Sequence, residues 1–166
     1  MSINKDLAKV ISYAESNNIT VNILPFKRGG GDSAELDFDT RTITVWKRTT
    51  DSKTSILASI LHELGHLTTF TTNPELFDEY FRISNLTTMP SKEERKEIYL
   101  RESQDISKMS MLRELLELKV NPLIIQCWQE FDTWQYKYYW LYGVYPITKL
   151  RLKKRKELGI KYNIKF

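Results

Sequence analysis

The two histidines of this chain stand four residues apart, at His62 and His66, and Glu63 directly follows the first. They form the sequence HELGH, inside a segment whose apolar residues recur with helical spacing. Residues four apart lie one above the other on a helix face, so two imidazoles can converge on one ion. Glu63 would project beside that ion, where it can take a proton from water and later deliver it to a leaving group. The spacing therefore predicts a metal site suited to hydrolysis.

A tetrahedral zinc ion that keeps one position for water needs a third protein ligand beside the two histidines. Because the chain has no other histidine and a single cysteine, we expect this ligand to be a carboxylate. The candidates all follow the motif, and they are Glu75, Asp78, Glu79, Glu102, Asp105, Glu114 and Glu117. Glu114 borders the apolar side of its predicted helix, whereas Glu117 projects nearly opposite to that side. Glu114 is therefore the first choice, before Glu117 and Glu75, and the alternative is that it is a solvated helix charge.

HELGH on a helix, a smaller helix, strand and hairpin before it, and a glutamate on a downstream helix together resemble the zincin metallopeptidases. The resemblance covers roughly residues 1–121 and points to the compact ImmA/IrrE-like and phage-encoded group. It implies a zinc-dependent peptidase with a gluzincin-like His/His/Glu site, in which His62, His66 and Glu114 bind zinc and Glu63 is the catalytic base. It also implies that an extended protein substrate adds to an edge strand before the active-site helix, here residues 42–47.

The group that stabilises a developing oxyanion must be another residue type, since no third histidine is present. The candidate donors are Arg113 and the tyrosines of the run WQYKYYWLY, which are Tyr136, Tyr138, Tyr139 and Tyr142. Bulky aromatic side chains mostly supply packing area to a core or a lid. We therefore expect most of these tyrosines to be structural.

Apolar periodicity predicts the elements that position the motif. In order, it predicts a helix, a strand, a glycine-rich turn and an antiparallel hairpin, over residues 3–17, 21–26, 27–33 and 34–47. Asp51 or Ser52 is expected to cap the helix that carries the motif. On that helix the histidines fall almost opposite the apolar stripe, and Gly65 leaves room for another backbone to approach closely. We therefore expect the imidazoles to face a cleft whose other wall comes from later in the chain.

The elements after the motif are predicted to be helical. They are a short helix over residues 74–83, one long helix or two in succession over 91–121, and a final helix over about 123–142. The Asn121-Pro122 pair is expected to stop the long helix. We expect an α+β, zincin-like fold with a small antiparallel or mixed sheet, consisting of one domain over residues 1–148 and a basic segment over 149–166.

Composition predicts a cytoplasmic protein of a bacterium or of a phage-infected cell. The 166 residues are 41% hydrophobic and 28% charged, which is typical of one soluble domain. No apolar run approaches the length of a membrane-spanning helix, and the first residues lack the apolar stretch of a signal peptide. A lone cysteine, Cys127, cannot form an internal disulfide.

Charge is unevenly distributed along the chain. The net charge is +4, but residues 145–166 contain eight Lys or Arg against one acidic residue. Such a segment is either an ordinary solubilising end or a contact surface for nucleic acid or an acidic partner. The alternative function is therefore a catalytically silent binding module with a zincin fold, which uses its basic end to hold such a partner.

Overall fold

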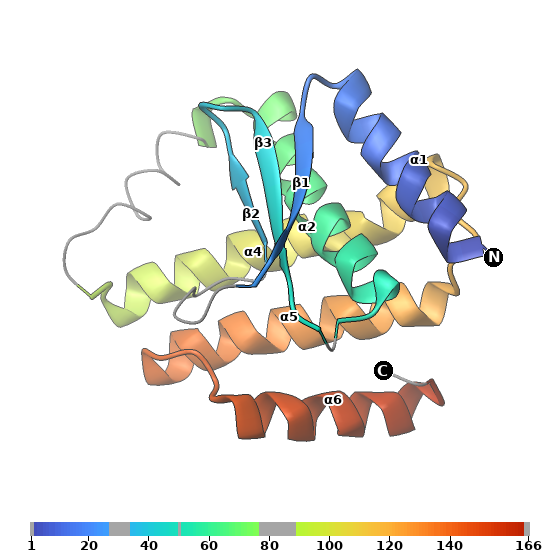
Figure 1. Ribbon diagram of the computed structural model, residues 1–166. Helices are drawn as coiled ribbons and strands as arrows, with labels where there is room; N and C mark the ends of the chain where they lie inside the picture. The colour runs from blue at the N-terminus through green and yellow to red at the C-terminus, as the bar shows by residue number, and fades with distance from the viewer. Residues whose placement is uncertain (1, 27–33, 50, 77–88, 165–166) are drawn as a thin grey trace.

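The computed structural model describes residues 2–26, 34–49, 51–76 and 89–164. Its elements are α1 (Ser2–Ser16), β1 (Thr20–Pro25), β2 (Ala34–Asp37), β3 (Thr42–Lys47), α2 (Lys53–Thr72), α4 (Lys92–Leu115), α5 (Pro122–Tyr142) and α6 (Thr148–Tyr162). In Figure 1, α4 crosses behind the sheet and packs along α5, which lies below the sheet, and α6 lies below α5. The fold is α+β, as the sequence predicts.

The sheet is small and mixed, with the strand order β1-β3-β2. β3 pairs in parallel with β1, from Thr20 opposite Thr42 to Pro25 opposite Lys47. It pairs antiparallel with β2, from Ala34 opposite Val45 to Asp37 opposite Thr42, which confirms the predicted hairpin. The expectation that residues 42–47 form an edge strand is wrong, because β3 lies between the other two strands and cannot accept a further one.

The main core joins α1, β3, α2 and α4. Val10, Ile43, Leu57, Leu61 and Ile106 are among its members with less than 2% exposure. α2 is central to this core, because it contacts α1, the sheet and α4 at once. The helix that carries HELGH is therefore held from several sides, as a site with a fixed geometry requires.

Helix boundaries follow the local capping chemistry. The Ser52 side chain accepts a hydrogen bond from the Ser55 N–H and begins α2, as predicted. Ser91 and Glu94 form a reciprocal capping box that begins α4. The long helical run is one helix rather than two, and it ends at Leu115 instead of at Asn121. Asn121 does not stop a helix but caps the start of α5, where Pro122 occupies the first turn.

The basic end of the chain forms α6, which packs against α5. Leu158 is 1% exposed and joins Cys127 and Phe131 of α5 in a second, smaller core. The other faces of α6 carry most of its Lys and Arg residues, and Leu152 and Ile160 are exposed among them. This helix thus has one buried side and a broad basic side.

Several sequence-based expectations concern residues outside the described ranges. These are the glycine-rich turn at 27–33, most of the short helix predicted after Pro74, and the ligand candidates Asp78 and Glu79. Among the described helices, none is both long enough and apolar enough to span a bilayer.

Candidate metal centre

Helix α2 carries both histidines on the side that faces α4 and α5. His62 is 8% exposed and His66 6% exposed, and their ring centroids lie 5.1 Å apart. Glu63, which is 8% exposed, lies between them in the sequence. The prediction that the imidazoles face away from the main apolar stripe toward later chain agrees with this placement, but α4 and α5 cover them closely instead of leaving a wide cleft.

Glu102 of α4 joins the two histidines in one compact group. Its Oε2 atom lies 3.2 Å from Nε2 of His62 and 3.4 Å from Nε2 of His66, and the residue is 3% exposed. A tetrahedral zinc ion with bonds of about 2.0–2.1 Å would hold its ligand atoms about 3.3–3.4 Å apart. Each nitrogen therefore has the spacing from the carboxylate oxygen that two zinc ligands have, and all three atoms lie within 4.8 Å of one another.

The other nitrogen of each imidazole faces an aspartate. Nδ1 of His66 lies 2.8 Å from Oδ2 of Asp105, and Nδ1 of His62 lies 3.4 Å from Oδ2 of Asp132 on α5. An N–H donated from Nδ1 to a carboxylate leaves the lone pair on Nε2, so it fixes the tautomer that binds a metal. Both rings thus direct Nε2 toward Glu102, which is the arrangement that a metal centre needs.

Asp105 is itself held by further polar contacts. The Thr69 hydroxyl donates a hydrogen bond to Oδ1 of Asp105, and the Lys108 ammonium donates to the Thr69 hydroxyl. Nζ of Lys108 also lies 3.6 Å from Oδ1 of Asp105. This chain of contacts keeps Oδ2 of Asp105 available for His66.

Without a bound cation, the acidic surroundings make the histidines strong proton acceptors. Burial by itself lowers the pKa of His66, but Glu102, Asp105 and Glu63 outweigh it and raise this pKa to about 10. Burial is likewise outweighed at His62, where Asp132, Glu102 and Glu63 raise the pKa. At Glu102 burial raises the pKa, but the two histidines hold it below its usual range. The group therefore provides strong electrostatic stabilisation for positive charge.

Gly65 allows α4 to come this close. An ideal Cβ at position 65 would collide with the backbone carbonyl oxygen of Asp105. Any side chain here would push α4, and with it Glu102 and Asp105, away from the histidines. The prediction that Gly65 permits a close backbone approach is confirmed.

The structure does not bring the first-choice third ligand to the histidines. Glu114 is exposed, and at about 1.5 Å per residue it lies about 18 Å farther along α4 than Glu102. Glu117 and Glu75 are also exposed, and neither belongs to the cluster. Of the described candidates, Glu102 and Asp105 occupy the site, with Glu102 at the position of a ligand and Asp105 behind His66.

Helix geometry explains why Glu114 lies away from the histidines. Its ranking assumed that the helix extends past residue 118, whereas α4 ends at Leu115, where Met111 and Leu115 are exposed. The buried face of α4 is Glu102, Asp105, Ile106, Met109 and Leu112. Extending the apolar stripe of Ile106, Met109 and Leu112 toward the N-terminus reaches Asp105 and Glu102, and this signal was present in the sequence.

Of the predicted oxyanion donors, Tyr136 is the one whose described ring contacts include a histidine of the site. Its ring packs edge-on at 6.3 Å from the ring of His62. Tyr138 packs against Tyr142, and Tyr139 stacks on Tyr145. Arg113 donates from Nε to the Val120 carbonyl, near the end of α4.

The chain was also compared with known proteins. No family model matches it, and no curated protein or solved structure gives a significant match. The chemistry of the site therefore has to be inferred from the residues themselves.

Proposed function

We propose that this protein is a zinc-dependent metallopeptidase of the zincin class. The observation that carries the proposal is the position of Glu102, whose Oε2 atom lies 3.2 and 3.4 Å from the Nε2 atoms of a HELGH helix. Two histidines and one carboxylate are the protein ligands of many catalytic zinc sites, which keep a fourth position for water or substrate. His62, His66 and Glu102 would hold the ion, with Glu102 in the role first assigned to Glu114.

The residues around the ligands have distinct tasks in hydrolysis. Zinc, when bound, supplies a Lewis acid that acidifies water and polarises the substrate carbonyl. Glu63 takes a proton from the attacking water and returns it to the leaving amine. Its charge raises the pKa of both histidines, so its carboxylate lies within electrostatic reach of the site. Asp105 and Asp132 hold the imidazoles in the tautomer that keeps each Nε2 free of a proton.

The substrate would be an extended peptide, and β2 provides the edge on which it can pair. β2 is an outer strand in the order of the sheet. Phe38, the residue after β2, packs edge-on against Phe70 at 5.0 Å, and Phe70 stacks at 6.4 Å from His66. A peptide added to β2 would thus run toward the histidines. Tyr136, beside His62, is the residue we assign to stabilising the oxyanion.

The experiment compares the wild-type protein with Glu63→Gln. Each is loaded with zinc, its metal content is measured, and it is incubated with a library of peptides whose new termini are read by mass spectrometry. We expect about one zinc per chain in both proteins, and cleavage that is about 100- to 10,000-fold slower in Glu63→Gln. Glu114→Gln makes the same chemical change at an exposed position and should cleave like the wild type. Equal cleavage by Glu63→Gln and the wild type would overturn the assignment of the base.

The low exposure of the cluster favours a second candidate, in which the metal is structural. The three ligand residues are only 3–8% exposed, which resembles a closed site more than an open one. In that case zinc would raise the melting temperature, but no new termini would appear with any peptide. A folded protein that takes up no zinc would exclude both candidates.

A further inference from the structure

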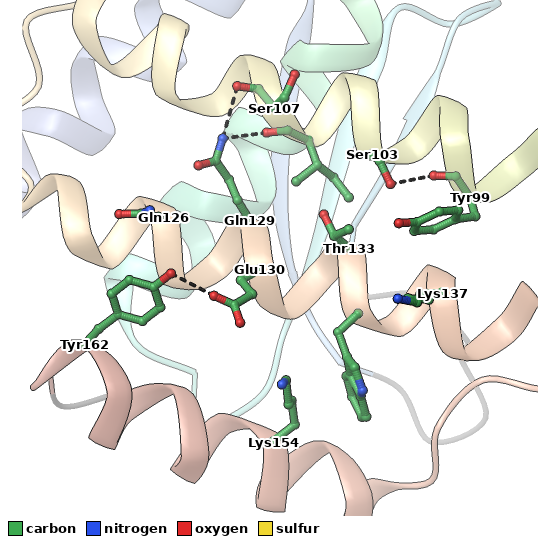
Figure 2. A pocket seen from close by; sticks show the side chains of 12 residues that line it. Tyr99, Ser103, Ser107, Gln126, Gln129, Glu130, Thr133, Lys137, Lys154 and Tyr162 are labelled. Carbon is green, nitrogen blue, oxygen red and sulfur yellow. Dashed lines mark hydrogen bonds between the residues drawn. The ribbon is translucent and has the colours of Figure 1, made fainter. Parts of the chain in front are cut away.

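A groove lined by polar and aromatic side chains lies on the side of α4 and α5 that faces away from the sheet. It has a volume of about 510 Å³ and is bounded by α4, α5 and α6 (Figure 2). This volume is within the range of small-ligand sites. Ile106 is the sole aliphatic residue among its described lining residues, and the other large side chains with apolar surface are the aromatic residues Tyr99, Trp134 and Tyr162. We call it the α6 groove.

The charge of the α6 groove is positive. Lys137 of α5 and Lys154 of α6 both line it. Its one carboxylate among the described lining residues, Glu130, is already occupied, since it accepts from Nζ of Lys161 at 2.6 Å and from the Tyr162 hydroxyl at 2.7 Å. Neither Lys137 nor Lys154 has an ion-pair partner within the described part of the chain. The groove therefore presents two lysines that form no ion pair, and Lys154 lies within electrostatic reach of Glu130.

The surface beside the groove extends this positive charge. Lys149, Lys153 and Lys156 are exposed on the outer side of α6, and they too have no ion-pair partner in the described ranges. Helix α6 as a whole contains seven Lys or Arg against a single acidic residue. An anionic polymer could follow this helix beyond the groove, whereas a small anion could not use these charges.

Aromatic rings are also part of the lining, and packing fixes two of them. The Tyr99 ring stacks on Trp140 with centroids 5.3 Å apart and planes at 19°. The Trp134 ring stacks on Phe131 with centroids 6.0 Å apart. Rigid rings next to lysines are the combination by which proteins hold single-stranded nucleic acids, since bases stack on the rings and phosphates contact the cations.

From these observations we propose that the α6 groove binds single-stranded nucleic acid. Lys137 and Lys154 contact phosphates, Trp134 and Tyr99 stack with bases, and the lysines on the outer side of α6 continue the phosphate path. A duplex fits less well, because its bases are already stacked and cannot enter a groove lined by aromatic rings. This inference is independent of the metal centre, whose residues on α4 and α5 do not line the groove.

The test is fluorescence anisotropy with a labelled single strand of about 20 thymidine nucleotides. The proteins are the full-length wild type, Lys137→Gln/Lys154→Gln, and Trp134→Leu. The matched control is Lys5→Gln/Lys119→Gln, which removes the same charge at two exposed positions outside the groove. Each titration is repeated over a range of salt concentrations, and with a duplex of the same length and with vesicles containing anionic lipid.

We expect the wild type and the control to bind the single strand, and the groove lysine variant to bind on the order of ten-fold more weakly at about 0.1 M salt. A plot of its log binding constant against log salt concentration should be less steep by about 1.4, because each of the two lost phosphate contacts to a single strand contributes about 0.7 to that slope. Trp134→Leu should weaken binding while its salt slope stays unchanged. The proposal is overturned if the single strand does not bind at low salt, if groove and control variants lose affinity equally, or if the duplex or the vesicles bind as tightly.

Discussion

The two faces of the α4–α5 pair have opposite electrostatic designs. The face toward α2 has three carboxylates, Glu102, Asp105 and Asp132, each within 3.4 Å of an imidazole nitrogen. The face toward α6 borders an open groove lined by Lys137 of α5 and Lys154 of α6, neither of which forms an ion pair within the described residues. Buried charges need partners, whereas exposed ones keep their hydration and stay available to a ligand.

Neighbouring residues in the sequence serve these two faces. Asp105 contacts His66, and Ile106 beside it lines the α6 groove. Asp132 lies against His62, and Thr133 lines the groove. One pair of helices therefore forms a wall of both sites, and substitutions that act on one face or the other can test the difference.

The largest effect is expected from Glu102→Ala on the inner face. It removes a metal ligand and leaves two imidazoles without their shared carboxylate. Zinc affinity should therefore fall by more than about 100-fold, which is more than the loss caused by replacing a residue that only hydrogen-bonds to a ligand. Glu114→Ala, on the same helix but exposed, should retain zinc like the wild type. Zinc titration with a competing chelator measures both affinities. Equal zinc binding by the two variants would remove Glu102 from the site.

The next largest effect is expected from Asp105→Asn. The amide keeps the size of the side chain but not the charge that orients His66 and stabilises it, so zinc affinity should fall about 10- to 100-fold. Asp37→Asn, at the exposed end of β2, is the control and should change zinc affinity little. The same chelator titration decides the outcome. An unchanged affinity in Asp105→Asn would mean that His66 is oriented by packing alone.

Gly65→Ala should destabilise the fold and weaken the metal site together. The added methyl meets the Asp105 carbonyl, and overpacking of this kind costs about 1–3 kcal/mol. For a chain of this length, the melting temperature should fall by about 2–4 °C for each kcal/mol. Gly159→Ala makes the same substitution in α6 and should be neutral or stabilising by up to about 1 kcal/mol. If Gly65→Ala melts like the wild type, α2 and α4 are not held at this separation.

A further effect is expected from pH acting on the zinc-free protein. His66 has a folded-state pKa near 10, above its usual value of about 6.5, so its stabilisation is complete below about pH 6.5 and is lost as pH rises toward 10. The lowered pKa of Glu102 acts oppositely, and its contribution is lost only in acid, below about pH 4.5. The melting temperature in the presence of chelator should therefore decrease from pH 6.5 to pH 10.

The stabilisation by zinc should depend on pH in the opposite direction to the melting temperature of the zinc-free protein. Metal binding needs neutral imidazoles, so the rise in melting temperature on adding zinc should grow from pH 6 to pH 8. Glu102→Gln removes the main charge partner of His66 and should flatten the curve of the zinc-free protein. A zinc-free melting temperature that is flat between pH 6.5 and pH 10 in the wild type would contradict the electrostatic account of the inner face.

Local sequence patterns predicted most helices and strands. The order of the strands and the residues that meet the histidines depend on contacts between distant parts of the chain. Helix α1, the hairpin, the helix of the motif and its Ser52 cap follow from periodicity and capping, which act within a few residues. The central place of β3 depends on its pairing with β1, about 20 residues away, and no local pattern encodes that pairing. The third ligand was ranked on helix amphipathicity, which fails near a helix end. Asp132 was not foreseen at all, because an acidic residue in an aromatic-rich helix has no distinctive spacing.

The contact at Gly65 limits how this site can change through evolution or design. The atom that a Cβ would strike belongs to the main chain, which every residue at position 105 would supply in the same place. No exchange of the facing side chain can therefore compensate for a larger residue at position 65. A randomised library that varies both positions should return glycine at 65 alongside many residues at 105, unless the two helices themselves are moved apart.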